Sequence, residues 1–389
     1  MNMRTLLQSG VFASGIFAIG ALAATRAVPF APPAADGVRT GEYTRSFEAH
    51  YEAAFPTRSF GINLWAAVQY LLFREGRPDV VVGSADWLYT AEEFRGWPGA
   101  DASLATNLDL IAAVDRSLSR RGTTLIVALI PAKARLYPEF HRTIAAASLH
   151  RDLYTRARRG LLDRGVTTPD LFASLADCKA AVPVFLRTDT HWTPAGANCA
   201  AQEIAQTAQR LRRTTARPQT YFTHAGRSRE HKGDLMRFLP LDPHFSSLLP
   251  AADLFETADT AAAFEPDLLA DSAPPEAVLI GTSYSADPLW NFGGALREHL
   301  QEDVLNLADV GHGPFAPMFA YLDTPTGASA PRLLIWEIPE RYLPMPPAER
   351  PAAVSALLLP TQPTSQPPSQ PTSQPTSLPL PTTRGGITT

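Results

Sequence analysis

A serine that follows a buried strand is the first candidate for chemistry in this sequence. Ser283 comes after the apolar run Ala277–Ile280 and the turn residues Gly281 and Thr282. A serine between a strand and a helix projects its hydroxyl from the carboxyl edge of a parallel sheet, where α/β enzymes place their sites. The N–H groups at the start of that helix can stabilise an oxyanion. The same pattern is also ordinary turn chemistry, and Ser285 is the competing nucleophile.

An aspartate and a histidine two residues apart supply the matching base. Asp189 and His191 precede Thr193 and Pro194, which are typical of a helix N-cap and first turn. In an extended segment this spacing places both side chains on one side of the chain. A carboxylate beside an imidazole holds its tautomer and stabilises the imidazolium that forms when the histidine takes a serine proton. The alternative is a solvated loop in which His191 only caps backbone.

A glycine-containing loop completes the set. The apolar segment 303–307 predicts a strand that ends in a loop with Gly311 and Gly313. Glycine allows the close backbone approach that an oxyanion donor requires, although a plain glycine turn fits equally. Together, a nucleophile, a base with its orienting carboxylate and a second oxyanion loop are the groups that acyl transfer needs.

The elements that must position these groups alternate between strand and helix. The run Thr124–Ile130 is continuously apolar, which indicates a strand buried on both faces of a parallel sheet. Strands are predicted at 79–83, 124–130, 277–280, 303–307 and 332–338, and helices at 60–75, 104–120, 194–211 and 288–300. This alternation predicts an α/β fold of three layers with a mainly parallel sheet.

The two ends of the chain differ from this central part. Residues 1–24 have an early cation, an apolar stretch and an Ala-Leu-Ala site, which predict a cleaved export signal; an uncleaved inner-membrane anchor facing the periplasm is the alternative. Residues 25–45 are predicted to be a linker and 46–347 the catalytic domain. Residues 348–389 are rich in Pro, Thr, Ser and Gln, so we expect a disordered tail.

Charge and cysteine content narrow the class of protein. The net charge of −4 argues against nucleic acid as a partner. The nine histidines lack the paired spacing of a zinc motif, so we expect neither a metal nor another cofactor. Cys178 and Cys199 are the only cysteines. Outside the cytoplasm a disulfide between them is expected, around the segment that carries Asp189 and His191, and two buried thiols are the alternative.

Several motifs follow one another in the order typical of a known family. The chain resembles the periplasmic alginate O-acetyltransferases of the AlgX/AlgJ type, whose catalytic domain has an SGNH-hydrolase-like, flavodoxin-like fold with a circularly permuted motif order. The resemblance covers roughly residues 46–347 and is carried by RTDTHWTPAGA, HKGDLMRFLP, GTSYSADPLWNFGGAL, DVLNLADVGHGP and LLIWEIPERYLP. It implies that Ser283 is the nucleophile, His191 the general base and Asp189 its partner, with the N–H groups of Ser283 and Gly311 as oxyanion donors.

The sequence also departs from the family pattern. Gly-Thr-Ser replaces Gly-Asp-Ser, and residues 336–341 stand where SGNH enzymes carry an asparagine motif, which leaves the second oxyanion donor open. One branch of the family has a C-terminal carbohydrate-binding module, for which residues 348–389 offer no room. Polymer binding is therefore expected from the catalytic domain or from partner proteins. Four residues near the motifs are candidates for lining a sugar groove, each with packing or a salt bridge as its alternative role: Tyr284, Trp290, Arg297 and Arg341.

The resemblance implies an exported O-acetyltransferase that acetylates a bacterial exopolysaccharide, alginate or a similar polymer, in the periplasm. Because acetyl-CoA is cytosolic, a membrane-bound O-acyltransferase is the expected acetyl donor, with other polymer biosynthesis and secretion proteins as partners. Two alternatives are a secreted carbohydrate acetylesterase with the same triad and a non-catalytic polysaccharide-binding scaffold of a secretion complex.

Overall fold

The computed structural model describes residues 10, 12–21, 37, 39–55, 57–141, 152–211, 219–263, 275–323, 330–347, 349 and 355. Most of the predicted signal 1–24, linker 25–45 and tail 348–389 therefore lies outside the described residues. Residues 12–21 are helical, and α2 (Glu42–Ala54) begins inside the range predicted as linker. Among the described helices, none combines the length and apolar character needed to cross a membrane.

A parallel sheet of four strands forms the centre of the domain. Its order is β3 (Thr124–Ile130), β8 (Leu333–Pro339), β6 (Ala277–Ile280) and β7 (Val304–Asn306), and every neighbouring pair is parallel. All residues of β6 and β8 are buried, as expected for strands covered on both faces. The predictions for β3 and β6 are confirmed residue for residue, and those for β7 and β8 to within one residue at each end.

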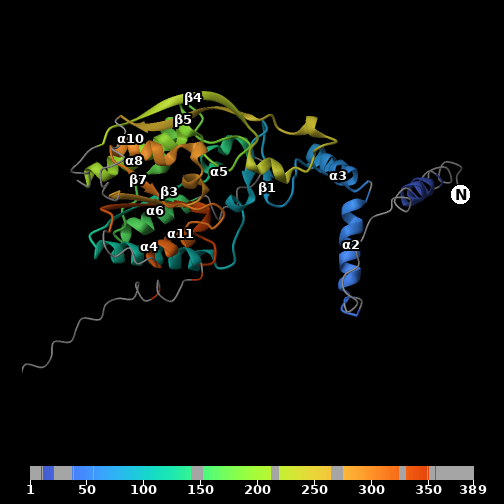
Figure 1. The fold of residues 1–389 in the computed structure, drawn as a ribbon, viewed down its shortest axis with the longest axis horizontal. Coiled ribbons are helices and arrows are strands. Elements are labelled where there is room, and N and C mark those ends of the chain that lie inside the picture. The colour runs from blue at the N-terminus through green and yellow to red at the C-terminus, as the bar shows by residue number, and fades with distance from the viewer. Residues whose placement is uncertain are drawn as a thin grey trace, which may run out of the picture. The chain divides into compact units, whose positions relative to one another are not determined.

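Helices cover both faces of this sheet, which confirms the predicted three-layer α/β fold (Figure 1). On one face lie α7 (Leu171–Lys179), α8 (Pro194–Arg210) and α10 (Phe292–Leu300), and on the other α4 (Ala100–Ser119), α6 (Leu153–Asp163) and α11 (Phe315–Asp323). Successive residues of a strand point to opposite faces. In β3, Ile126 and Ala128 therefore join the first core cluster, whereas Leu125 and Val127 join the second.

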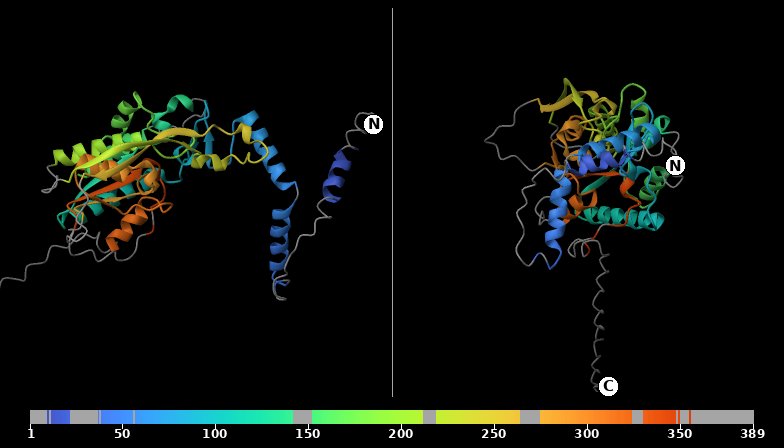
Figure 2. Two further views of the ribbon diagram at one scale, coloured as in Figure 1. Left: turned by 45° about the horizontal axis from the view of Figure 1, so that its top comes forward. Right: turned by 90° about the vertical axis from the view of Figure 1, so that its right-hand side faces the viewer.

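Two antiparallel ribbons stand apart from the central sheet. One pairs β1 (Val80–Val82) with β2 (Leu88–Thr90), and the other pairs β4 (Tyr221–His231) with β5 (Asp253–Ala262). The longer ribbon packs on α10 and extends along the domain (Figure 2). The sequence did not predict β4 and β5, because most of β4 is exposed and it lacks the apolar alternation of a half-buried strand.

Short helices and α3 complete the fold. The predicted helix 288–300 is divided at Asn291, whose φ of 51° ends η6 and precedes α10. α3 (Arg58–Phe73) buries Ala66, Ala67 and Tyr70 in a third apolar cluster with β1, β2 and η4. The remaining elements are α5 (Lys133–Leu136), α9 (Ser283–Ala286) and the 3₁₀ helices η2 (Ala91–Glu93), η3 (Pro138–Phe140), η4 (Asp234–Phe238), η5 (Ser246–Leu248), η6 (Pro288–Trp290) and η7 (Glu340–Tyr342).

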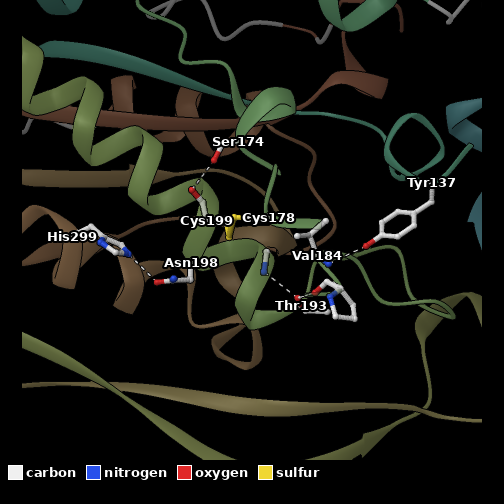
Figure 3. The surroundings of a disulfide bond; sticks show 10 residues. Tyr137, Ser174, Cys178, Val184, Thr193, Asn198, Cys199 and His299 are labelled. Carbon is white, nitrogen blue, oxygen red and sulfur yellow. Dashed lines mark hydrogen bonds between the residues drawn. A yellow bond between two sulfur atoms is a disulfide. The ribbon is translucent and has the colours of Figure 1, made fainter. Parts of the chain in front are cut away.

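A disulfide joins the helices on either side of the Asp189 loop (Figure 3). It connects Cys178 in α7 with Cys199 in α8, 21 residues apart in the chain. The start of α8 is held as predicted, since the Thr193 hydroxyl accepts the Gly196 N–H at 3.0 Å and donates to the Pro183 carbonyl at 2.6 Å. The loop with Asp189 and His191 is thus fixed at both ends.

Candidate active site

Ser283 lies at the carboxyl end of β6, where the strand turns into α9. Thr282 caps this short helix. Beneath the turn, the fully buried Glu337 of β8 accepts the Thr282 N–H at 2.6 Å and the Ser285 hydroxyl at 3.0 Å. Gly281 is required here, because a Cβ at this position would clash with the Glu337 carboxylate. The turn is therefore held from below by a side chain whose role the sequence did not predict.

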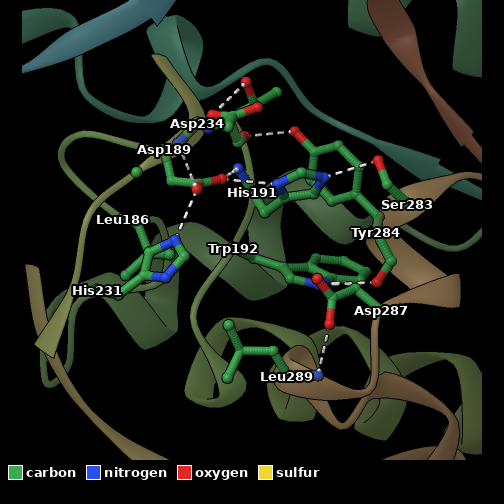
Figure 4. A network of polar contacts seen from close by, with 12 residues as sticks. Leu186, Asp189, His191, Trp192, His231, Asp234, Ser283, Tyr284, Asp287 and Leu289 are labelled. Atoms are coloured by element: carbon green, nitrogen blue, oxygen red, sulfur yellow. Dashed lines mark hydrogen bonds and ion pairs between the residues drawn. The ribbon is translucent and has the colours of Figure 1, made fainter. Parts of the chain in front are cut away.

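The structure brings Ser283, His191 and Asp189 into one hydrogen-bonded chain (Figure 4). His191 Nε2 lies 2.7 Å from Ser283 Oγ, across 92 residues of sequence, and His191 Nδ1 lies 2.6 Å from Asp189 Oδ1. The same carboxylate oxygen accepts the His191 backbone N–H at 2.9 Å. With Nδ1 protonated, His191 presents an unprotonated Nε2 to the serine, which is the tautomer that a general base requires.

Two buried aromatic rings hold the imidazole of His191 in place. The Trp290 ring is stacked on it at 5.2 Å and the Tyr284 ring lies at 4.8 Å. The Tyr284 hydroxyl donates to the Thr190 carbonyl at 2.7 Å, and burial raises the pKa of this phenol, so it remains a donor. Packing of this kind restricts the rotation of the His191 ring.

Asp189 has a second histidine partner, which sequence reasoning missed. His231, the last residue of β4, lies with Nε2 2.8 Å from Asp189 Oδ2, and the Asp234 N–H donates to the same oxygen at 2.9 Å. Burial alone would raise the pKa of the Asp189 carboxyl, but hydrogen bonds from His191 and His231 hold it well below its usual range. The hydrogen bond to Asp189 in turn raises the pKa of His231. In the sequence, His231 is marked only as the first residue of the motif HKGDLMRFLP, which by itself predicts no chemistry.

A buried lysine supports the backbone of the same loop. Lys133 Nζ donates to the carbonyl oxygens of Leu186, Arg187 and Asp189 at 2.9, 3.2 and 2.6 Å. Burial lowers the pKa of Lys133 to about 8. Because three carbonyl oxygens converge on one ammonium, the backbone on which Asp189 stands is fixed independently of the carboxylate.

A cleft of about 240 Å³ opens onto Ser283 and His191. Its charged walls are largely paired, since Arg341 donates to Glu92 at 2.9 Å and Asp79 lies 3.5 Å from Arg95. Arg237 is exposed in this wall, with its guanidinium over the ring of Phe238. The remaining lining residues are Thr90, Thr190, Asp234, Leu235, Phe238 and Tyr342.

The four residues predicted to line a sugar groove have different positions. Arg341 lies in the wall of the cleft. Tyr284 and Trp290 are each only 1% exposed and pack against His191, so their predicted contact with sugar is corrected to support of the base. Arg297 is paired with Asp303 at 2.9 Å and donates to the Val304 carbonyl, so it fastens α10 to the start of β7 and is not among the cleft residues.

The predicted oxyanion loop runs beside the serine turn. The N–H groups of Leu307 and Asp309 donate to the carbonyls of Leu279 and Gly281, so the segment after β7 continues along β6 to the turn. Gly311 follows two residues later with a φ of 84° and is exposed. Its role as an oxyanion donor stays a prediction.

Asp189, His191 and Asp234 each place one possible metal-ligand atom within 4.8 Å of the other two. In the described part of the chain, no other set of three His, Cys, Asp or Glu side chains converges in this way. Each already has a hydrogen-bond partner. Asp189 and His191 bind each other, and Asp234 Oδ1 accepts the Thr190 N–H at 2.8 Å. The arrangement is accounted for by the orientation of the histidine.

Comparison with known proteins agrees with the fold. Residues 80–340 match the family described as "SGNH hydrolase-like domain, acetyltransferase AlgX". The chain is 46% identical over 311 residues to a "Probable alginate O-acetylase AlgJ" of Pseudomonas putida, which covers 78% of this chain and 80% of the relative. It is 44% identical over 352 residues to the protein of the same description in Azotobacter vinelandii, with 89% of this chain and 90% of the relative covered.

A solved structure extends the likeness to three dimensions. The "O-Acetyltransferase Domain of Pseudomonas putida AlgJ" superposes with a TM-score of 0.67 at 43% identity and covers 72% of this chain and 99% of that domain. The family match spans most of the region 46–347. The chain therefore belongs to the AlgX-type family of SGNH hydrolase-like acetyltransferase domains.

Proposed function

We propose that this chain, as a member of the SGNH hydrolase-like acetyltransferase family, transfers acetyl groups to hydroxyls of alginate or a similar exopolysaccharide, with Ser283 as the nucleophile. The observation that carries the proposal is the hydrogen-bonded chain from Asp189 through His191 to Ser283 at the end of β6. The names of the relatives, alginate O-acetylases, support the substrate class.

The first half of the reaction forms an acetyl-enzyme. His191 Nε2 takes the proton of Ser283 Oγ as that oxygen attacks the acetyl carbonyl of the donor. Backbone N–H groups at the start of α9, and Gly311 as the predicted second donor, would stabilise the oxyanion. When the tetrahedral intermediate collapses, the protonated His191 gives its proton to the leaving group, and the acetyl group stays on Ser283.

The second half transfers the group to sugar. A polymer hydroxyl gives its proton to His191 and attacks the acetyl ester, and the returning proton restores the Ser283 hydroxyl. Transfer competes with hydrolysis, so the acceptor must occupy the cleft in place of water. Arg237 and Arg341 are the cations in the cleft wall, and a guanidinium suits the carboxylate of a uronic acid.

Features of the chain and of its proposed reaction support a periplasmic location. The apolar N-terminal stretch and the Cys178–Cys199 disulfide support export to an oxidising compartment, the periplasm. Because acetyl-CoA is cytosolic, the acetyl group must be passed across the membrane, and we assign that step to a membrane-bound O-acyltransferase. Other proteins of polymer synthesis and secretion would then deliver the acceptor.

The test separates transfer from its alternatives. Purified chain is incubated with an activated acetyl ester, with and without alginate oligosaccharides, and both intact mass and products are measured. We expect a mass increase of one acetyl group that passes to sugar when oligosaccharide is added. Ser283→Ala should abolish this mass increase. It should also lower turnover at least about a thousandfold, as removal of a triad nucleophile does in other enzymes.

Ser285→Ala is the matched control, because this neighbouring serine donates to Glu337 and not to His191. It should still acquire the acetyl group. Release of acetate alone in the presence of acceptor would identify an esterase. Unchanged polymer acetylation in cells that carry Ser283→Ala would identify a non-catalytic scaffold.

A further inference from the structure

α3 has a composition that a surface helix of a water-soluble domain does not need. Between Arg58 and Arg74 it contains no charged residue, and its polar side chains are few and uncharged. Helices that are apolar all round are normally buried on every side. Here only one side is buried. Its buried residues are Ala66, Ala67 and Tyr70, which belong to the third apolar cluster, and Asn63, which donates to the Pro240 carbonyl.

The opposite side of α3 is apolar and exposed. Trp65 is 62% exposed and Leu72 is 71% exposed, and no described residue covers them. The exposed apolar side chains of α3 are Phe60, Ile62, Leu64, Trp65, Leu71, Leu72 and Phe73, of which Phe60 packs on His244 and Phe245 and Phe73 lines a pocket beside β1. A helix that leaves this many large apolar side chains exposed marks a surface that binds something.

The chemistry around this face favours lipid over protein. α3 has 16 residues, so at about 1.5 Å per residue it is about 24 Å long and too short to span a bilayer. Arg58 is its first residue, and Arg74 and Arg77 follow it with Glu75 between them, which leaves an excess of cations where anionic headgroups would lie. An apolar face with an aromatic residue and flanking cations is typical of a helix that lies in the plane of a membrane surface.

The chain outside the domain points to the same partner. The apolar stretch 6–24 lies only some thirty residues before α3 in the sequence, and its described part is a helix with exposed Phe12, Ile16 and Phe17. We propose that the exposed face of α3 lies on the surface of an anionic lipid bilayer, a contact that α3 makes whether or not the N-terminal apolar segment is cleaved.

This contact would bring the cleft near the membrane. η4 contributes Leu235 and Met236 to the apolar cluster beneath α3, and Asp234 and Arg237 to the cleft at Ser283. The short helix η4 therefore contributes both to the apolar cluster beneath the proposed lipid-facing helix and to the cleft at Ser283. An enzyme held in this way would receive an acetyl group at the point where a membrane-embedded donor releases it.

The test places a fluorescent probe on α3 in the full chain. Since Cys178 and Cys199 are paired, Leu72→Cys supplies a single free thiol for labelling. The labelled chain is reconstituted into vesicles of anionic phospholipid that carry a spin-labelled quencher at the headgroup end of the acyl chain. Leu254→Cys is the matched control, because Leu254 is 69% exposed on β5.

We expect the lipid quencher to quench the probe at 72 and not the probe at 254. Trp65→Glu added to Leu72→Cys should weaken the lipid-contacting state about tenfold or more, because loss of a buried aromatic side chain exceeds the roughly 1.4 kcal/mol that a factor of ten represents. Quenching should also fall when zwitterionic lipid replaces anionic lipid.

Two results would overturn the proposal. One is a probe at 72 that lipid does not quench but that an aqueous quencher reaches freely. The other is a probe shielded from both quenchers, since another protein surface, a second copy or another part of the same chain would then cover α3.

Discussion

His231 offers the sharpest test of how this site is built. Replacing it with leucine removes one hydrogen bond from the Asp189 carboxylate, at 2.8 Å, and leaves the bonds from His191 Nδ1, the His191 N–H and the Asp234 N–H. A hydrogen bond to a charged group contributes about 1.5–3 kcal/mol. If that contribution orients the base in the transition state, kcat/KM should fall between about tenfold and a hundredfold.

The assay is hydrolysis of an activated acetyl ester, with kcat and KM measured separately. The loss should fall on kcat and leave KM unchanged, because His231 contacts Asp189 and is not among the cleft residues. His231→Gln retains a donor and should lose less. His299→Leu is the control, because His299 bonds the neutral Asn198 at 2.9 Å in α8.

The reasoning is refuted if His231→Leu keeps the kcat of the native chain. A fall in kcat that His299→Leu matches would show general destabilisation instead of a positioning role. Thermal unfolding of each variant, measured in parallel, separates the two.

Three further outcomes follow from the same contacts. Cys178→Ser with Cys199→Ser should lower the free energy of unfolding by about 3 kcal/mol, since the bridge closes a 21-residue separation, and denaturant titration would measure it. Arg237→Gln should raise KM for a uronate polymer but not for a small acetyl ester, whereas Arg297→Gln should change neither, as steady-state kinetics on both substrates would show. The bond to Asp189 raises the pKa of His231 in the folded chain, so its contribution to the free energy of unfolding is fully present below the unfolded pKa of about 6.5. This contribution should be lost as pH rises through the folded pKa. His231→Gln should remove the resulting slope of unfolding free energy against pH.

Local patterns in the sequence were enough for the framework of the fold. Continuous apolar runs of strand length predicted β3 and β6, because a strand covered on both faces has no polar side to display. Thr193 and Pro194 placed the start of α8 for an equally local reason, since an N-cap and its helix are neighbours in the chain. Ser283, His191 and Asp189 could be named because each stands beside such an element.

The tertiary structure decided how distant segments meet. His191 and Ser283 are 92 positions apart in the chain. The strand order of the sheet and the loop closed by the disulfide bring them into contact. No hydrophobic periodicity in the sequence predicts this contact.

The supports of the site were beyond sequence reasoning for the same reason. His231 comes from the exposed strand β4 and Glu337 from the buried strand β8, each far from its partner in the chain. Tyr284 and Trp290 were expected at a sugar groove, because an aromatic residue near a motif has the same appearance whether it faces solvent or a histidine. Whether a segment forms a helix or a strand depends mainly on its neighbours in the sequence. Whether a side chain is buried, and which side chains it contacts, is determined only when separate elements pack together.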